Sequence, residues 1–288
     1  MAKIEVNGLT LDYELIGEEG APPLVLTPGG RYARDTAGVP ELGAELAKGG
    51  FRVLLWDRPG CGASDIAFTA ASESVMNCEA LVGLIKALDL KDVRLAGGSA
   101  GSRVTLMAAA RMPESVRKVA IWWISGGPVG LAGLAWFYCG DQIAAASKGG
   151  MEAVVELPSW ADQIARNPKI RDILLAQDPD EFIETMQQWG KAFAYRDDTP
   201  VPGMTASDFA RLTMPVLTFR SGKSDMAHTR RTSEWTHEML PHSRLVEPPW
   251  REDEWNYVST FPMDLANRRG RFERWPLLST MLLDFFRD

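Results

Sequence analysis

The chain has 288 residues, 45% of them hydrophobic and 24% charged, so it can bury a sizeable core in one large domain with an insertion or in two small domains. Its formal net charge of -7 argues against a nucleic-acid partner, because domains that bind nucleic acids carry basic faces. Three scattered cysteines form no metal-ligand cluster, which indicates reduced thiols, a cytoplasmic location and no bound metal; they are Cys61, Cys78 and Cys139.

Strands and helices alternate over the first 127 residues. The predicted strands are 3–6, 9–16, 24–27, 51–56, 93–96 and 118–124, and the predicted helices are 40–48, 72–88 and 102–111. Asn7-Gly8 predicts a hairpin turn between the first two strands. This order predicts a mainly parallel sheet with helices on both faces and antiparallel strands at one edge.

The pattern changes at Pro128. From there to Leu212 the sequence is helical in character and rich in Trp, Met and Phe, and then strands 215–219 and 244–247 and helices 230–240 and 276–286 follow. We therefore expect one α/β core made of 1–127 and 213–288, interrupted by a helical insertion over 128–212.

The uncharged stretch 119–140 mimics a membrane span, which needs about 20 apolar residues in one helix. Ser125-Gly126-Gly127-Pro128 interrupts it, so we expect a buried strand up to Ile124, a turn and an apolar helix, with no membrane contact. The N-terminus also lacks the basic and apolar regions of a secretory signal.

The segment 93–101 runs from a strand into Gly97-Gly98-Ser99-Ala100-Gly101, with a helix after it. Small residues around the serine permit a sharp turn that presents the Ser99 hydroxyl at the N-terminus of the following helix. This context predicts a nucleophile; the alternative is a glycine-rich turn with a spectator serine.

These features together resemble the α/β-hydrolase family, which implies a mostly parallel sheet of eight-stranded type with an inserted helical cap. Pro28-Gly29-Gly30 looks like the family's oxyanion loop, with Pro28 in place of the usual His, and the resemblance assigns the oxyanion-hole N–H groups to Gly30 and Ala100. The turn 57–64 resembles a structural turn of the family, so Cys61 within it is interpreted as a packing residue.

A serine nucleophile needs a base and a residue that orients the base. The resemblance places the acid after strand 215–219, at Asp225. It places the histidine after the last strand, where this chain has none. Among the three histidines, chain geometry directs His237 and His242 away from the active-site end and toward the surface, which leaves His228.

Three arrangements stay open. Asp225 orients His228 from the same loop; or an acid of the later loop, Glu252, Asp253 or Glu254, orients it; or no triad exists.

We expect a hydrolase that acts through a Ser99 acyl-enzyme on an ester, lactone, thioester or carbon–carbon bond beside a carbonyl of a small molecule, without a metal or organic cofactor. The aromatic cap suggests a mostly apolar substrate contacted by Trp136, Trp160 and Trp189, although these residues could equally form the cap core. The alternatives are a non-hydrolytic enzyme of this fold, such as a lyase or a cofactor-free oxygenase, and a ligand-binding protein without catalysis.

Overall fold

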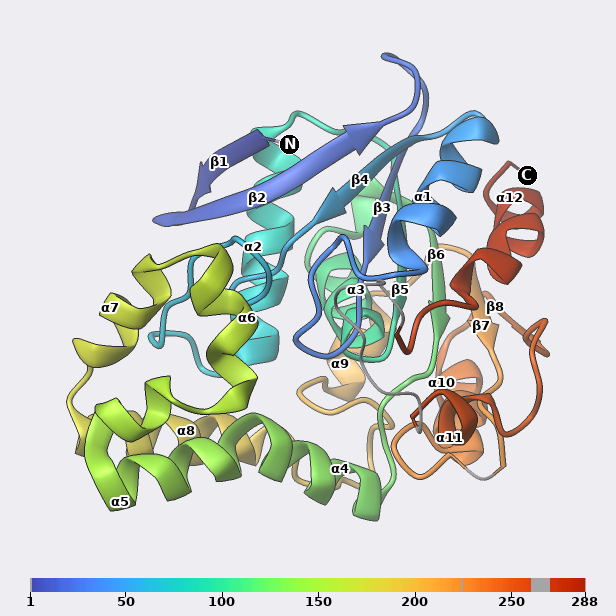
Figure 1. Ribbon diagram of the computed structural model, residues 1–288. Helices are drawn as coiled ribbons and strands as arrows, with labels where there is room; N and C mark the ends of the chain where they lie inside the picture. Colours follow the sequence, from blue (N-terminus) through green and yellow to red (C-terminus); the bar gives the residue numbers. More distant parts are fainter. Residues whose placement is uncertain (1, 224, 260–269, 288) are drawn as a thin grey trace.

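A computed structural model describes residues 2–223, 225–259 and 270–287 of the chain (Figure 1). Its centre is an eight-stranded sheet in the order β1-β2-β4-β3-β5-β6-β7-β8. The strands are β1 (Ala2–Val6), β2 (Leu9–Ile16), β3 (Pro23–Thr27), β4 (Arg52–Trp56), β5 (Val93–Gly98), β6 (Val116–Trp122), β7 (Val216–Phe219) and β8 (Ser243–Val246). At one edge, β1 pairs antiparallel with β2, and β2 pairs antiparallel with β4. All the other pairs, from β4–β3 to β7–β8, are parallel. The predicted fold class is confirmed.

The inner strands are continuous apolar runs because both of their faces are covered. Alternate residues of one strand enter opposite cores: Leu24 and Leu26 contact one, and Val25 contacts the other. By contrast, β1 lies at the edge, and only Val6 of its five residues is buried. The pattern of burial therefore follows the position of each strand in the sheet.

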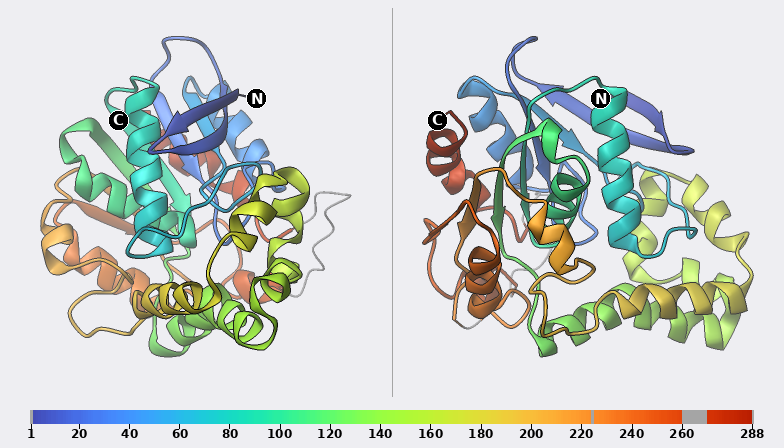
Figure 2. Two further views of the ribbon diagram at one scale, coloured as in Figure 1. Left: turned by 90° about the vertical axis from the view of Figure 1, so that its left-hand side faces the viewer. Right: turned by 180° about the vertical axis from the view of Figure 1, so that it is seen from behind.

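Helices cover both faces of the sheet (Figures 1 and 2). The helices and short helical turns of the core are α1 (Val39–Lys48), α2 (Glu73–Ala87), α3 (Ala100–Arg111), η1 (Pro113–Ser115), α9 (Ala206–Ala210), α10 (Arg230–Met239), α11 (Glu254–Ser259), η3 (Trp275–Leu278) and α12 (Ser279–Arg287). One face packs against α2 and α3 through side chains such as Leu84 and Val104. The other packs against α1 and α12 through side chains such as Leu42 and Leu282. This arrangement leaves the carboxyl ends of the parallel strands free for a site.

A second group of helices lies beyond the end of the sheet toward which β3 and β6 run (Figure 1). It consists of α4 (Pro128–Ala135), the π-helical turn η2 (Trp136–Gly140), α5 (Asp141–Val155), α6 (Pro158–Arg166), α7 (Lys169–Leu175) and α8 (Pro179–Lys191). These helices share a hydrophobic cluster of their own, in which Ile66 and Met76 are the fully buried members from outside the insertion. We refer to α4–α8 with η2 as the cap. No described helix, in the cap or elsewhere, is long and apolar enough to cross a membrane.

Element boundaries differ from the expected ones near the active-site end. The strand predicted to reach Ile124 stops at Trp122, because Trp123 takes a left-handed backbone conformation with φ 48°. The helix expected from residue 102 begins at Ala100, directly after Ser99. Helix α11 follows the last strand where no helix was expected, and the closing helix is preceded by the short turn η3.

Candidate active site

Ser99 occupies the turn between β5 and α3. Its backbone has φ 57° and ψ -122°, a conformation that costs a non-glycine residue of the order of 1–3 kcal/mol and that persists only when its surroundings hold it. Two contacts do so: Ser99 N donates to Trp122 O over 3.1 Å, and Ser99 O accepts from the Ser102 hydroxyl over 2.6 Å. The strained turn presents the Ser99 side chain at the N-terminus of α3.

The glycines around Ser99 are required by close packing. A Cβ on Gly97 would lie 2.6 Å from Gly101 O, and a Cβ on Gly101 would lie 2.2 Å from Thr27 O, both far inside contact distance. The strand-to-helix turn therefore tolerates only glycine at these two positions, which explains the spacing seen in the sequence.

The structure brings His228 and Asp225 together with Ser99. The Ser99 hydroxyl lies 2.8 Å from His228 Nε2, and His228 Nδ1 lies 3.0 Å from Asp225 Oδ2. The other oxygen of Asp225 accepts the backbone N–H groups of Ala227 and His228, over 3.0 and 2.8 Å. The carboxylate thus folds its own loop with Oδ1 and contacts the imidazole with Oδ2. Both side chains are buried: the exposed fraction is 1% for His228 and 3% for Asp225.

Aromatic rings surround the imidazole on two sides. The Trp123 ring stacks on His228 at a centroid distance of 6.2 Å, and Trp255 approaches it edge-on at 4.3 Å. Trp123 also packs against Trp250 and Trp275, so the strained residue after β6 lies at the centre of an aromatic cluster. The sequence analysis did not assign Trp123 or Trp255 to the site; the only signal was their position after strands that end at this side of the sheet.

The other carboxylates considered for the relay have other partners. Glu252 pairs with Arg230 at 2.9 Å, Asp253 pairs with Arg251, and Glu254 pairs with Arg274 at 3.2 Å. Among the described residues, none of these ion pairs involves His228. The geometry of the described residues therefore favours the arrangement in which Asp225 and His228 share one loop.

The remaining histidines lie elsewhere. His242 is exposed in the turn before β8, beside the start of β7 and away from its carboxyl end. His237 lies on α10 and is half-buried, and among the described residues its enclosed Nδ1 has no hydrogen-bond partner, so its side chain is less solvated than that of His242.

The loop after β3 lies directly against Ser99. A Cβ on Gly29 would be 2.8 Å from Ser99 Cβ. Within the described residues, the backbone N–H groups of Gly30 and Ala100 make no hydrogen bond, as oxyanion-hole donors require before a substrate binds. The buried guanidinium of Arg58 donates to the carbonyl oxygens of Gly29 and Gly30 and so ties this loop to the turn after β4. Arg58 is a positioning residue that the sequence analysis did not single out.

The turn that follows β4 supports this loop. Asp57 accepts the backbone N–H groups of Arg34 and Ala63, and burial raises the pKa of its carboxyl to about 6. Burial likewise raises the pKa of the Cys61 thiol to about 11, so the thiol is neutral at physiological pH. The contacts and burial of both residues agree with a structural role for this turn.

Two of the three tryptophans named as possible substrate contacts lie inside the cap. Trp160 donates to Gln142 over 2.7 Å, Trp189 donates to Ala70 O over 2.8 Å, and both side chains are fully buried. Their packing favours the alternative in which they form the cap core. Trp136 is 61% exposed and lines an apolar groove on the outside of the cap.

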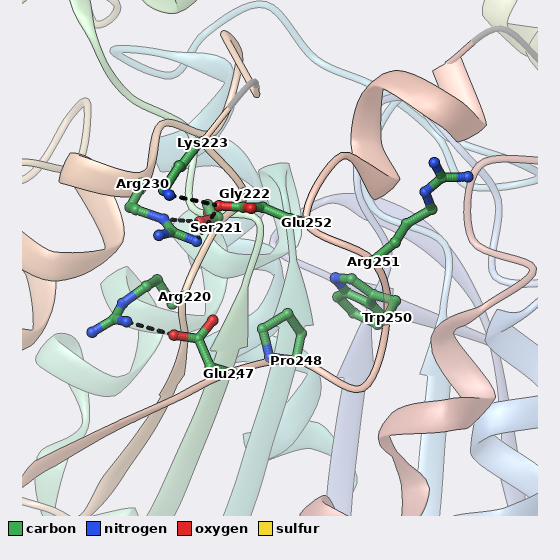
Figure 3. Close-up of a pocket in the computed structure, with 10 residues that line it drawn as sticks. All are labelled: Arg220, Ser221, Gly222, Lys223, Arg230, Glu247, Pro248, Trp250, Arg251 and Glu252. Carbon is green, nitrogen blue, oxygen red and sulfur yellow. Dashed lines mark hydrogen bonds and ion pairs between the residues drawn. The ribbon is translucent and has the colours of Figure 1, made fainter.

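A polar pocket of about 320 Å³ lies beside the loop that carries Asp225 (Figure 3). Its cationic side chains are largely neutralised, because Arg220 pairs with Glu247 while Lys223 and Arg230 pair with Glu252. Arg251 points away from the carboxylates of Glu247 and Glu252 in this view. Because these cationic side chains are paired with carboxylates of the pocket itself, we assign no chemistry to it.

Comparison with known proteins identifies the fold. A family model described as alpha/beta hydrolase fold matches residues 22–122. The human serine hydrolase BPHL is 28% identical over 247 residues, which cover 85% of this chain and 77% of the relative. A 2-hydroxy-6-oxononadienedioate/2-hydroxy-6-oxononatrienedioate hydrolase of Pseudomonas putida is 31% identical over 124 residues, 43% of each protein. The mouse serine hydrolase BPHL is 37% identical over 42% of this chain and 42% of its own length. The matches to the mouse and Pseudomonas putida proteins therefore each span less than half of the relative's length.

Solved structures agree over the whole chain. The enol-lactonase from Burkholderia xenovorans superposes with a TM-score of 0.63 at 20% identity and covers 100% of both chains. The 2-hydroxy-6-oxo-6-phenylhexa-2,4-dienoate hydrolase from a Rhodococcus strain superposes with a TM-score of 0.61 at 21% identity, and the match covers 99% of this chain and 98% of that one. With the eight-stranded sheet and the serine turn after β5, these matches confirm the fold that the sequence resemblance implied: the chain has the α/β-hydrolase fold.

Proposed function

We propose that this protein is a serine hydrolase in which Ser99 is the nucleophile, His228 the base and Asp225 the residue that orients the imidazole. The observation that carries the proposal is the continuous pair of contacts from Ser99 Oγ to His228 Nε2, 2.8 Å, and from His228 Nδ1 to Asp225 Oδ2, 3.0 Å. A nucleophile within hydrogen-bond reach of a base that a third group orients is the arrangement that acyl transfer requires.

The geometry supports the following steps. Ser99 Oγ attacks the carbonyl carbon while His228 Nε2 accepts the hydroxyl proton, and the carbonyl oxygen becomes an oxyanion that accepts from the N–H groups of Gly30 and Ala100. As the tetrahedral intermediate collapses, the imidazolium returns the proton to the leaving group. Water, deprotonated by His228, then releases the acid from Ser99. One preorganised oxyanion donor contributes about 2.7–4 kcal/mol to such a step.

We infer that the substrate is a small molecule whose ester, lactone or carbon–carbon bond lies next to a carbonyl. The similar proteins support this range, because they include a serine hydrolase, a 2-hydroxy-6-oxononadienedioate/2-hydroxy-6-oxononatrienedioate hydrolase and an enol-lactonase. The described relay also favours hydrolysis over a ligand-binding role, because a protein that only binds does not need a serine held in a strained backbone conformation against a histidine. We further propose that 128–212 acts as a cap over this site.

An active-site-directed fluorophosphonate tests the proposal. The Ser99 oxygen should displace fluoride from phosphorus, and intact-mass measurement should show one adduct per chain, mapped to Ser99. Ser99→Ala should take up no label. Ser147→Ala, which removes the exposed hydroxyl of a cap serine that contacts Ile143 O, should label as the wild type does. Stoichiometric labelling of Ser99→Ala, or an unlabelled wild type, would contradict the assignment.

A further inference from the structure

A cavity of about 360 Å³ lies between the loop that follows Gly30 and the cap. Arg31 and Tyr32 line it from the loop, Phe137 and Gln163 line it from the cap, and Arg271 lines it from the segment before η3. We call it the loop–cap cavity. It is distinct from the pocket of Figure 3, since the two share no lining residue.

Contacts connect this cavity to the nucleophile. The Tyr32 ring meets the Phe272 ring edge-on at 5.1 Å, and a Cβ on Gly29 would lie 3.2 Å from Phe272 Cζ and 2.8 Å from Ser99 Cβ. Arg31 directly follows Gly30, a proposed oxyanion donor. Tyr32, which lines the cavity, is thus linked to Ser99 through Phe272 and Gly29, so the cavity lies close to the nucleophile.

The charge that lines the cavity is positive. Three guanidinium groups, those of Arg31, Arg166 and Arg271, face one carboxylate, that of Asp162. Arg166 is neutralised, because it pairs with Asp35 and Asp162, both at 2.9 Å. Arg31 pairs with Glu73 through Nε at 3.1 Å, and Arg271 has no ion pair with any residue in the described ranges.

Two further buried arginines, Arg58 and Arg103, lie behind Arg31 near Tyr138. Among the described residues, Arg58 donates to the carbonyl oxygens of Gly29 and Gly30, and Arg103 donates to the hydroxyls of Ser74 and Ser125, all of them neutral groups. Burying unpaired charge is costly, and a bound anion offsets that cost.

Both cavity arginines keep an unused donor. Arg31 Nη1 and Arg271 Nε are enclosed and have no hydrogen-bond partner among the described residues, and the Arg31 side chain is only 5% exposed. A buried N–H of a charged group left without an acceptor costs about 1–3 kcal/mol or more. A carboxylate supplies acceptor oxygens for guanidinium N–H groups in a favourable planar geometry. The apolar wall that Phe137 contributes suits the carbon chain of such a ligand.

We propose that the loop–cap cavity is a substrate subsite for a carboxylate, so that the substrate carries a free acid group, held by Arg31 and Arg271, in addition to the bond attacked at Ser99. This inference rests on the proposed function of Ser99. It assigns a chemical class to the part of the substrate that the reaction does not alter.

Matched substrate pairs test the subsite. Mono-p-nitrophenyl glutarate and its methyl ester place the acid, or its neutral equivalent, on the acyl side; 4-acetoxybenzoic acid and its methyl ester place it on the alcohol side. In at least one pair we expect kcat/KM to be about tenfold or more higher for the acid, as a charge-assisted hydrogen bond provides. Arg271→Gln should lower this acid-to-neutral ratio about tenfold, and Arg271→Lys should lower it less. Arg244→Gln, which removes the same charge from an exposed position of β8, should leave the ratio unchanged.

The outcomes separate the two proposals. If wild type hydrolyses the neutral esters and prefers neither acid, the subsite is wrong and the hydrolase stands. If wild type turns over nothing and Ser99 takes up no fluorophosphonate, the hydrolase is wrong. The subsite is then decided by calorimetry on the full chain: adipate at millimolar concentration should bind to wild type, adipamide should not, and Arg271→Gln should weaken adipate binding. Equal binding of adipate by Arg271→Gln, or no binding by wild type, overturns the subsite.

Discussion

At the scale of single residues, the site depends on one carboxylate that does two things. Asp225 Oδ1 accepts two backbone N–H groups and so folds the loop, while Oδ2 faces His228 Nδ1 at 3.0 Å. Because acid and base lie three residues apart, the loop itself sets their distance. The imidazole is then held by the Trp123 and Trp255 rings, which leaves Nε2 directed at Ser99.

This geometry predicts different effects of changes at the acid and the base. His228→Ala should lower kcat about as much as Ser99→Ala, because members of one relay act as a unit. Asp225→Asn should keep the loop, since an amide oxygen still accepts backbone N–H groups. Its amide N–H should instead face Nδ1, favour the tautomer with hydrogen on Nε2, and lower kcat by up to about 10⁴-fold. Turnover of a p-nitrophenyl ester measures all three variants.

Matched changes outside the relay serve as controls. His237→Ala removes the half-buried imidazole of α10, and Asp253→Asn removes a carboxylate that pairs with Arg251. Both should retain kcat within about tenfold of the wild-type value. If Asp253→Asn were as damaging as Asp225→Asn, or if His228→Ala retained most activity, the relay assigned here would be wrong.

At the scale of elements, the position of Ser99 depends on how closely the loop after β3 approaches the turn after β5. Gly29 has no room for a side chain: an added Cβ would meet Ser99 Cβ at 2.8 Å and Gly98 O at 2.9 Å. Both neighbours belong to the strained turn, so the loop or the serine must move. Arg58, which holds the carbonyl oxygens of Gly29 and Gly30, resists movement of the loop.

Gly29→Ala should therefore give a folded protein of low activity. A misplacement of about 1 Å between reacting groups can lower the rate about 100-fold, and we expect kcat/KM to fall by about that factor. Gly133→Ala is the matched control, because an added Cβ on this cap residue meets nothing within 4 Å. It should leave kcat/KM unchanged and, by helix propensity, raise stability by up to about 1 kcal/mol. Circular dichroism melting and ester turnover measure both variants; equal activity of the two would contradict the tight contact.

Periodicity and turn residues allowed most elements to be predicted, because the inner strands and the amphipathic helices each have a local pattern. The errors lie where tertiary contacts override it. The strand β6 stops before Trp123 because that side chain joins Trp250, Trp255 and Trp275 in a cluster formed by segments far apart in the sequence. Helix α11 contributes Trp255 to the same cluster, and the sequence after β8 has no helical period long enough to reveal it.

At the scale of the whole molecule, composition alone could not divide the aromatic residues of the insertion between a cap core and a substrate surface. Both roles call for Trp, Phe and Met, and only packing separates them: Trp160 and Trp189 are enclosed by other cap helices. The sequence likewise could not decide which acid belongs to the candidate site. Ser99 could be found from its local motif, whereas the choice among acids required the distance between loops, which no sequence spacing provides.

Polar contacts join the cap to the core. Arg31 of the core loop pairs with Glu73 and donates to Tyr138 O of the cap over 3.1 Å, and Gln163 Nε2 donates to Arg31 O over 3.4 Å. Each side has its own hydrophobic cluster, and from outside the insertion Ile66, Phe68, Ala70 and Met76 pack with the cap cluster. Separation of the cap therefore exposes less apolar surface than unfolding of either part, and we expect the cap to open or unfold before the core.

The reactivity of the three cysteine thiols can measure the difference in stability between the cap and the core. Cys139 belongs to the cap cluster, Cys78 to the core cluster under α2, and Cys61 to the turn after β4. Burial raises the pKa of Cys61 to about 11 and the pKa of Cys78 and Cys139 to about 12, from an ordinary 9.0. A raised pKa lowers the thiolate fraction at a given pH, so at pH 8 at most about one thiol in 1,000 is reactive, and steric enclosure lowers the rate further.

Native protein should therefore not react with Ellman's reagent at pH 8. In increasing urea, with the modified peptide identified by mass spectrometry, Cys139 should react at a lower urea concentration than Cys78; Cys139→Ala should lack this early phase and keep the later one. A single midpoint for both thiols would mean that cap and core unfold as one cooperative unit, and earlier reaction of Cys78 would reverse the order of stability that the two clusters predict.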